Sequence, residues 1–236
     1  MPHPPLLTRL ARIAPYFRAS RPGFAVAIAA AAVSAATEPI SIPPSLLISA
    51  LGQIDDVAQA VTMDLKEPGN WLYQVGMTKD EMGGSHYALV RGIAGGRVPK
   101  VDPAIAKRTF AALHAAMATG LVRACHDLSE GGLAVAAAEM AFAGGLGARI
   151  DLAAVPCTAD AAEPAVLLFS ESNTRFLCEV RPRDAAAFES AVAGVPSARI
   201  GEVADTGRLA IAHGGQTLID ADLPTMKETW QKPLRW

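Results

Sequence analysis

The densest group of polar side chains in the sequence is Cys125-His126-Asp127-Leu128-Ser129-Glu130-Gly131-Gly132-Leu133. A strand is predicted before this segment and an Ala-rich helix after it, so Asp127, Ser129 and Glu130 are expected around a helix N-terminus. The free N–H groups and the positive dipole end of a helix suit a phosphate there, and a carboxylate such as Asp127 is a hard oxygen ligand for Mg²⁺. The segment therefore predicts a phosphate or magnesium-nucleotide site.

Three other interpretations of this segment stay open. In the first, Asp127 or Ser129 only caps the helix that follows. In the second, Cys125 and His126 act as nucleophile and base, although neighbouring residues on a strand point to opposite faces. A zinc site is the least supported, because no second ligand pair stands at a suitable spacing.

A second candidate is Gly83-Gly84-Ser85, which follows Asp80-Glu81-Met82 after a predicted strand. Paired glycines let the backbone approach an anion closely and offer adjacent N–H groups, and the serine adds a hydroxyl donor. These features predict a phosphate cradle, for which a plain turn is the alternative.

A third polar segment covers residues 170–174, between apolar runs at 166–169 and 176–180 that are both predicted as strands. Its side chains are candidates to line a site, with Arg175 available for a phosphate or for pairing with Glu171. A solvated turn explains the same residues equally well.

The composition narrows the class of protein. The chain has 236 residues, 51% of them hydrophobic, which is enough for one sizeable core or two small ones. With 21 basic and 23 acidic residues the net charge is -2, which argues against nucleic acid as a partner. Three cysteines outside any CxxC spacing indicate neither a disulfide framework nor a zinc site and fit a reducing compartment. No apolar run reaches the roughly 18 residues of a membrane-spanning helix.

The N-terminal segment differs from the rest of the chain. Residues 1–22 carry four arginines and no acidic residue, and residues 23–36 form an uncharged, Ala-rich run. This pattern matches a secretory signal in outline, but alanine is barely hydrophobic enough for insertion, so export is the minor interpretation. We expect residues 1–39 to be either a loosely packed, disordered extension or a start that is not native to the domain.

The remaining residues are predicted to form one ordered domain. The most secure helix begins at Asp102-Pro103, an N-cap followed by proline, and carries an apolar stripe of Ile105, Phe110, Leu113 and Met117. Strands and helices mix without a regular βαβ period, which predicts an α+β domain on a mixed sheet. Further helices are predicted at 132–142 and 182–192, and strands at 46–52, 71–76, 122–126, 148–152, 166–169, 175–180, 198–203 and 209–212.

The identity and order of four segments resemble the last part of the phosphoribosylformylglycinamidine synthase (PurL) family. They are residues 43–52, 81–87, 126–133 and 168–172 followed by Arg175-Phe176. The resemblance covers residues 40–236 and implies a PurM-like C-terminal domain, the second of two copies in that family. It does not extend to residues 1–39.

The resemblance also implies an activity and its ligands. Members of the family convert formylglycinamide ribonucleotide, ATP and ammonia from glutamine into formylglycinamidine ribonucleotide, ADP and phosphate, so ATP or ADP and Mg²⁺ are the implied cofactors. Nucleotide sites form between the N-terminal-type and C-terminal-type domains of that family. The implied contacts are Asp127 for the metal, Gly83, Gly84, Ser85 and Ser129 for nucleotide and phosphate, and Ser170, Glu171 and Ser172 on the substrate side.

We therefore expect a cytoplasmic ATP-dependent ligase part that is incomplete alone, with its catalytic residues unassigned. Its implied partners are the upstream PurL domains that hold the catalytic histidine, a glutaminase subunit, a small accessory subunit and the ribonucleotide substrate, with no nucleic acid or membrane. Two alternatives remain: a non-catalytic nucleotide-binding or assembly module, and another ATP-dependent enzyme of the PurM superfamily. That superfamily includes aminoimidazole ribonucleotide synthetase, selenophosphate synthetase and hydrogenase-maturation factors.

Overall fold

The computed structural model describes residues 24–25, 49, 51–54 and 56–235, in two units that divide after Ala58. In the first unit, β1 (Phe24–Ala25) pairs antiparallel with β2 (Leu51–Gly52). A 3₁₀ turn, η2 (Val57–Gln59), follows at the boundary between the two units. Most of the strand predicted at 46–52 and of the segment 1–39 lies outside the described residues.

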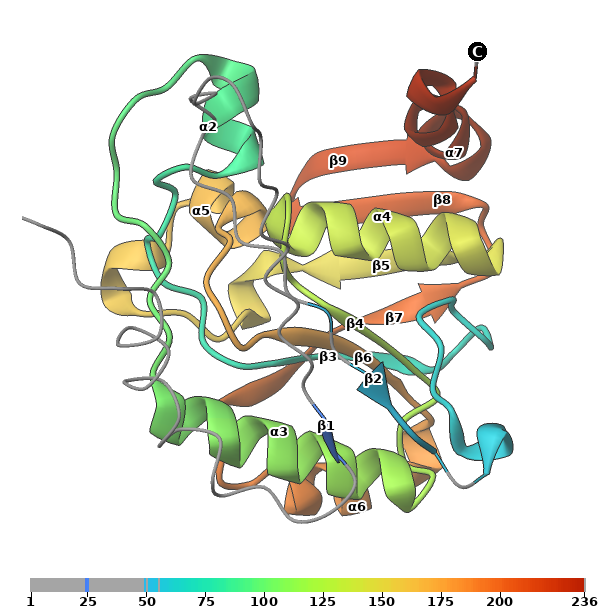
Figure 1. The fold of residues 1–236 in the computed structure, drawn as a ribbon. Helices are drawn as coiled ribbons and strands as arrows, with labels where there is room; N and C mark the ends of the chain where they lie inside the picture. The colour runs from blue at the N-terminus through green and yellow to red at the C-terminus, as the bar shows by residue number, and fades with distance from the viewer. Residues whose placement is uncertain (1–23, 26–48, 50, 55, 236) are drawn as a thin grey trace, which may run out of the picture. The chain divides into compact units, whose positions relative to one another are not determined.

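The second unit is built on a seven-stranded sheet with the order β4-β6-β3-β7-β5-β8-β9 (Figure 1). Neighbouring strands are antiparallel except for β5 and β8, which are parallel, so the predicted mixed sheet of an α+β domain is confirmed. The strands are β3 (Trp71–Val75), β4 (Ala124–Asp127), β5 (Gly147–Asp151), β6 (Phe176–Val180), β7 (Ser197–Ala204), β8 (Arg208–His213) and β9 (Gln216–Asp222).

Helices cover both faces of this sheet, with α4 and α5 on one face and α3 and α6 on the other (Figure 1). Successive side chains of β3 point to opposite faces, so Leu72 joins the core under α4 while Tyr73 packs against Phe188 of α6 at 5.1 Å between ring centroids. The helices are α2 (His86–Arg91), α3 (Pro103–Ala118), α4 (Gly132–Gly144), α5 (Pro164–Phe169), α6 (Ala185–Ala191) and α7 (Leu223–Gln231), with 3₁₀ turns η3 (Leu152–Ala154), η4 (Ala159–Ala161), η5 (Pro182–Asp184) and η6 (Lys232–Leu234).

The predicted start of α3 is confirmed in detail. The Asp102 carboxylate accepts hydrogen bonds from the N–H groups of Ala104 (2.9 Å) and Ile105 (3.0 Å), and Pro103 stands at the first helical position. These hydrogen bonds to the ionised form lower the pKa of Asp102 below its ordinary value. Local capping chemistry therefore determines where this helix begins.

Two predictions of local structure are wrong. Residues 166–169 belong to α5 and not to a strand, because Pro164 starts a helical turn and a short apolar run fits either period. The prediction for the apolar stripe of α3 is wrong for two of its four residues: Ile105 is 39% and Phe110 52% exposed, whereas Leu113 is buried and Met117 packs against the core. The buried face consists of Ala106, Thr109, Leu113 and Ala116. Small side chains let α3 pack closely.

Among the α-helices and the strands of the seven-stranded sheet, α2, β9 and α7 had no predicted counterpart. The first follows the Gly83-Gly84-Ser85 turn, and the other two form the end of the chain. Within the part of the chain that the structure describes, no helix has both the length and the apolar character needed to cross a membrane.

Gly144 makes a close backbone contact that gives a stability prediction. A Cβ at this position would lie 2.3 Å from the Leu65 carbonyl oxygen. We expect Gly144→Ala to lower the free energy of unfolding by about 2 kcal/mol through overpacking, although alanine is the better helix former by about 1 kcal/mol. Urea denaturation measures the difference.

Gly194→Ala is the matched control, because a Cβ there meets no atom within 4 Å. It is expected to change stability by less than about 0.5 kcal/mol. A Gly144→Ala protein that is as stable as the parent would contradict the close contact.

Candidate functional site

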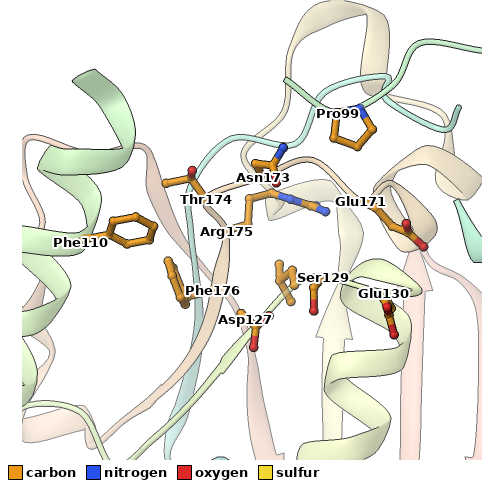
Figure 2. Close-up of a pocket in the computed structure, with 11 residues that line it drawn as sticks. Pro99, Phe110, Asp127, Ser129, Glu130, Glu171, Asn173, Thr174, Arg175 and Phe176 are labelled. Atoms are coloured by element: carbon orange, nitrogen blue, oxygen red, sulfur yellow. The ribbon is translucent and has the colours of Figure 1, made fainter. Parts of the chain in front are cut away.

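A cavity of about 410 Å³ opens at the end of the sheet where β4 ends and β6 begins (Figure 2). It brings together three of the predicted site residues, Asp127, Ser129 and Glu171, from segments far apart in the sequence. The complete lining is Pro99, Phe110, Asp127, Leu128, Ser129, Glu130, Glu171, Asn173, Thr174, Arg175 and Phe176.

Asp127 is the last residue of β4 and stands opposite Phe176 of β6 in the strand register. Its side chain is 60% exposed, so the carboxylate faces the cavity and solvent. The connection from β4 to α4 contains Ser129, and Leu128 N–H in this connection donates to the Arg175 carbonyl at 2.9 Å. The backbone therefore fixes the segment that presents Asp127 and Ser129.

Helix α4 begins without a side-chain cap. Its N-cap residue is Gly131, which has a left-handed φ of 76°. Gly132 is left-handed as well, and a Cβ there would lie 2.5 Å from the Ser170 carbonyl oxygen. The interpretation of Asp127 or Ser129 as a helix cap is therefore wrong, because glycine supplies the conformation that this close approach requires.

The Glu171 carboxylate lies at the start of two helices. One of its oxygens accepts hydrogen bonds from Gly131 N–H of the α4 cap and from His86 N–H of α2, each at 2.8 Å. The same oxygen lies 3.2 Å from Nδ1 of His86. A negative charge is favoured at helix N-termini, so Glu171 supplies from within the chain an anion that a helix start attracts.

Arg175 lies beneath this segment and is only 1% exposed. Its Nε–H donates to the Ser172 carbonyl at 2.9 Å, one terminal nitrogen donates to Thr78 Oγ1 at 3.0 Å, and the other donates to the Ser170 carbonyl. Burial lowers the pKa of Arg175 to about 10, while the charge of Glu81 opposes the shift. Arg175 is thus charged at neutral pH and holds the backbone, in place of the predicted pairing with Glu171.

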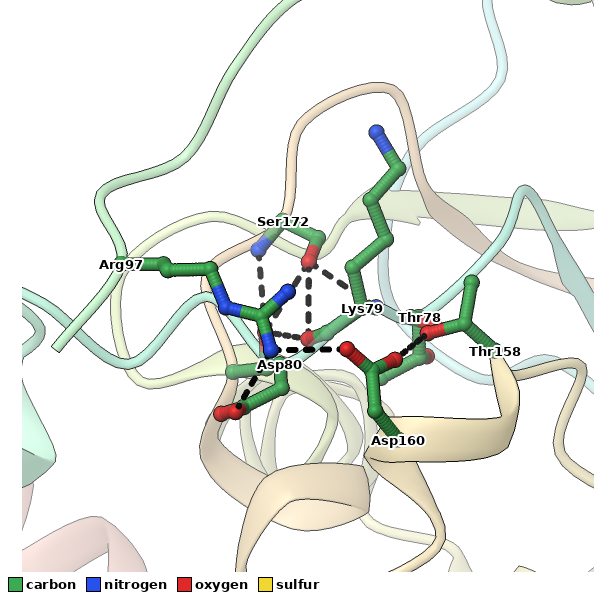
Figure 3. Close-up of polar contacts among 8 residues, drawn as sticks. Thr78, Lys79, Asp80, Arg97, Thr158, Asp160 and Ser172 are labelled. Carbon is green, nitrogen blue, oxygen red and sulfur yellow. Dashed lines mark hydrogen bonds and ion pairs between the residues drawn. The ribbon is translucent and has the colours of Figure 1, made fainter.

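Ser170 and Ser172 are buried, and their hydroxyls hold the backbone of Lys79. Figure 3 shows Ser172 beside Lys79. Ser170 Oγ–H donates to the Lys79 carbonyl at 2.8 Å, and Ser172 Oγ accepts from Lys79 N–H at 3.1 Å. Beside them, Arg97 pairs with Asp160 at 2.7 Å. The solvated-turn interpretation is therefore wrong for both serines, which do not line the 410 Å³ cavity.

The Gly83-Gly84-Ser85 turn precedes α2. Ser85 is buried, and its hydroxyl donates to the Met82 carbonyl at 2.8 Å and accepts from Ala88 N–H at 3.2 Å as the cap of α2. Gly83 N–H donates to the Arg97 carbonyl at 2.8 Å, while Gly84 is exposed with a φ of 76°. A phosphate contact by this turn stays a prediction, and the exposed residue that offers its backbone is Gly84.

Two residues that the sequence did not single out line a second cavity of about 280 Å³ on the other side of Asp127. They are Glu139 of α4 and Trp230 of α7, and their neighbour is His126, whose Nε2–H donates to Glu139 Oε2 at 3.0 Å. Glu139 lies within a helix otherwise made of apolar residues, which is the signal that could have found it.

The remaining interpretations of the β4 segment can be decided from these contacts. Cys125 Sγ lies beside Cys178 Sγ, while His126 lies beside Glu139, so the cysteine and histidine do not form a nucleophile pair. Among the described residues, no group of three or more His, Cys, Asp or Glu side chains could hold a metal ion by itself. The zinc interpretation therefore gains no support.

Comparison with known families identifies the class of domain. Residues 67–214 match the family described as AIR synthase related protein, C-terminal domain, and the chain belongs to this family. The PurL subunit of phosphoribosylformylglycinamidine synthase from Alkaliphilus metalliredigens is 33% identical over 202 residues, which are 84% of this chain and 26% of that protein. The PurL subunit of Leifsonia xyli is 39% identical over 72% of this chain and 22% of its own length.

Solved structures share the fold. A Thermotoga maritima PurL complexed with FGAR matches with a TM-score of 0.65 at 22% identity, over 72% of this chain and 30% of that chain. The Thermotoga maritima PurLQS structure matches with a TM-score of 0.62 at 21% identity, over 72% and 28% of the two chains. Escherichia coli HypE, a hydrogenase maturation protein, matches with a TM-score of 0.53 at 20% identity, over 74% and 54%. The chain spans about a quarter of the length of the curated PurL relatives.

The hydrogen bonds of Arg175 predict a large loss of stability on substitution. In Arg175→Lys a single ammonium replaces the guanidinium that joins Ser170, Ser172 and Thr78. We expect the free energy of unfolding to fall by about 3 kcal/mol, because buried acceptors lose their donors. Urea denaturation tests this, with the exposed Arg97→Lys as the control expected to keep the parent midpoint. An unchanged midpoint for Arg175→Lys would show that the guanidinium does not hold the segment.

Proposed function

We propose that this chain supplies the C-terminal-type domain of a phosphoribosylformylglycinamidine synthase in purine biosynthesis. In this reaction ATP phosphorylates the amide oxygen of formylglycinamide ribonucleotide, and ammonia displaces the phosphate to form the amidine. The observation that carries the proposal is the 410 Å³ cavity, which gathers Asp127, Ser129 and Glu171 at one end of the sheet. The family and the PurL relatives supply the reaction class.

The donor groups around the cavity are compatible with a magnesium-nucleotide. Mg²⁺ in such complexes takes one or two protein carboxylates together with phosphate oxygens and waters, so one exposed carboxylate is a sufficient contribution from this chain. Asp127 meets that requirement, since its side chain is 60% exposed at the cavity wall. When bound, the ion would neutralise phosphate charge.

Hydrogen-bond donors of the chain would orient the phosphates. The Ser129 hydroxyl lines the cavity, and the Gly84 N–H belongs to the exposed part of the α2 turn. Glu171 contributes on the substrate side by fixing the starts of α2 and α4, through its hydrogen bonds to His86 N–H and Gly131 N–H. Ser170, Ser172, Gly83 and Ser85 would then act through the backbone that they hold.

Exposed apolar side chains next to the cavity form a surface for the rest of a PurL-type enzyme. Val98, Val101, Ile105 and Phe110 are all exposed, and Phe110 also lines the cavity. A run of exposed apolar residues marks an interaction surface. An N-terminal-type PurL domain docked there would close the nucleotide site, and a glutaminase and a small accessory subunit would complete the cytoplasmic complex. The three free cysteines suit such a reducing compartment.

A second candidate is a domain that binds a nucleotide without turning it over. Several side chains that were predicted to contact the nucleotide or the substrate form hydrogen bonds within the chain instead, which favours this candidate. The hydroxyls of Ser85, Ser170 and Ser172 are all buried and hydrogen-bonded. In this case the site would hold ADP as a structural element between two domains.

The test combines the full chain with a PurL relative that lacks its own AIR-synthase-type last domain. ADP release is measured with formylglycinamide ribonucleotide, Mg-ATP and excess ammonium, which bypasses the glutaminase. We expect substrate-dependent ADP release from the mixture. Asp127→Asn is expected to lower it about 100-fold, because a magnesium-ligand contact is worth several kcal/mol.

Asp205→Asn is the control, because this exposed carboxylate lies between β7 and β8, away from the cavity lining. It is expected to retain the parent rate. Nucleotide binding without substrate-dependent release would favour the second candidate. Parent rates in Asp127→Asn would refute the metal assignment.

A further inference from the structure

Three side chains connect the C-terminal helix with Asp127. Trp230 Nε1–H of α7 donates to Glu139 Oε1 of α4 at 3.1 Å, and His126 Nε2–H donates to Glu139 Oε2 at 3.0 Å. His126 Nδ1 lies 3.3 Å from Asp127 Oδ1. We name Trp230, Glu139 and His126 the relay.

The relay restricts the orientation of the Asp127 carboxylate. Each Glu139 oxygen is held by a separate donor, so the carboxylate of Glu139 is fixed at both ends. Since imidazole is rigid, a fixed Nε2 also fixes where Nδ1 lies, and this ring atom, 3.3 Å from Asp127 Oδ1, limits the side-chain rotamers open to Asp127. An exposed carboxylate at a strand end would otherwise be free to sample several rotamers.

The orientation of the Asp127 carboxylate matters because this residue lies between two cavities. Asp127 lines both the 410 Å³ and the 280 Å³ cavities, and all three relay residues lie on the side of the smaller one. With one carboxylate oxygen beside the His126 ring, the other is directed away from the relay. Partners outside a metal's own ligands orient those ligands and tune metal affinity in this manner.

We propose that Trp230, Glu139 and His126 are positioning residues that hold the Asp127 carboxylate in one orientation, which makes α7 part of the site. The orientation itself follows from the contacts of the chain alone. Its effect on Mg²⁺ rests on the function proposed above.

The first test uses the full, ligand-free chain. Three-bond NMR couplings to Asp127 Cγ report its χ1 rotamer; we expect one rotamer in the parent and averaging in Glu139→Gln and Trp230→Phe. Glu139→Gln keeps the side-chain shape, and Trp230→Phe keeps an aromatic ring beside Phe142, whose ring centroid lies 5.6 Å from that of Trp230. Averaged couplings in the parent, or unchanged couplings in both variants, would overturn the proposal.

The second test measures ADP binding by calorimetry with Mg²⁺ and with EDTA. Glu139→Gln and Trp230→Phe are expected to weaken the Mg²⁺-dependent affinity about 10-fold and to leave the EDTA value unchanged. Glu228→Gln, which removes an α7 carboxylate paired with Arg235, is the control expected to match the parent.

A double-mutant cycle separates this proposal from the proposed function. If the relay acts through Asp127, adding Glu139→Gln to Asp127→Asn has no further effect on Mg²⁺-dependent affinity. Additive losses would overturn the relay while the function stands. If Asp127→Asn itself has no effect, the metal assignment fails, and the NMR couplings still decide whether the relay orients Asp127.

An independent observation concerns two cysteines on neighbouring strands. Cys125 of β4 stands opposite Cys178 of β6, with their sulfur atoms 3.7 Å apart. Cys125 N–H donates to the Thr62 carbonyl and not to β6, whereas Leu128 N–H donates to the carbonyl of Arg175, its counterpart three residues further along the ladder. Hydrogen-bonded and non-hydrogen-bonded pairs alternate in an antiparallel ladder. The alternation makes the cysteines a non-hydrogen-bonded pair, in which Cα atoms lie about 4.5 Å apart, near the lower limit for a disulfide.

We propose that Cys125 and Cys178 form a reversible disulfide with a small-molecule disulfide oxidant such as glutathione disulfide. The half-buried Cys125, as thiolate, attacks the oxidant and releases one glutathione thiolate, which leaves a mixed disulfide. Cys178 then loses its proton to solvent and attacks the Cys125 sulfur, which forms the protein disulfide and releases the second thiolate. Cys178 is fully buried, so the oxidant meets Cys125 first. The hydrogen bond with Cys125 and burial raise the pKa of Cys178, which agrees with a first attack by Cys125.

The test exposes the full chain to glutathione disulfide, blocks remaining thiols and maps the peptides by mass spectrometry. We expect a Cys125–Cys178 cross-link that dithiothreitol reverses, with Cys157 still alkylated. In Cys178→Ser, glutathione is expected to stay attached to Cys125. A parent protein that keeps the glutathione adduct, or that forms no cross-link, would overturn the proposal.

Discussion

The buried guanidinium of Arg175 is the constraint on which the geometry of the site depends. A charge at 1% exposure must have its hydrogen bonds satisfied, and the carbonyls of Ser170 and Ser172 turn inward to do so. This bend places Thr174 at a φ of 64°, and it requires glycine at position 76, where a Cβ would lie 2.2 Å from the Thr174 carbonyl oxygen. The backbone strain of the segment is therefore held in place by one buried cation.

The bent segment determines in turn where Glu171 projects. Because the residues on either side of it are clamped, its carboxylate reaches the starts of both α2 and α4. A second buried charge, Glu179, lies near the other end of β6 and accepts hydrogen bonds from Lys66 N–H and Asn70 Nδ2. Burial raises the pKa of Glu179 above its ordinary value. Strand β6 is thus anchored at each end by a charged group that holds a neighbouring loop.

The parts of the fold that follow from short-range chemistry could be predicted from the sequence. The start of α3 depends on Asp102 and Pro103 alone, and the end of α4 on the left-handed Gly145. The helix at residues 166–169 could not be distinguished from a strand, because four apolar residues fit both periods. In α3 the burial of Leu113 was predicted correctly, but large apolar residues such as Phe110 were also expected to be buried, whereas Phe110 faces the cavity.

Residues of the candidate site could be predicted from the sequence, but the contacts between them could not. Polar residues after β4 and after α5 stand out in the sequence, and the cavity joins them. Which of them face the cavity depends on long-range hydrogen bonds, such as those from Ser170 to Lys79 and from Arg175 to Thr78, that no local pattern encodes.

The contact between α7 and α4 is a second long-range feature that local sequence patterns do not encode. Glu139 and Trp230 are 91 residues apart, and although Glu139 stands out as the single acid of an apolar helix, no sequence pattern links it to the exposed Trp230. They meet because α7 packs against α4, and that packing depends on apolar contacts such as Phe142 with Trp230. The packing of α7 on α4 is therefore connected to Asp127 through two hydrogen bonds and the 3.3 Å contact between His126 Nδ1 and Asp127 Oδ1, so the site includes the helix farthest from it in the sequence.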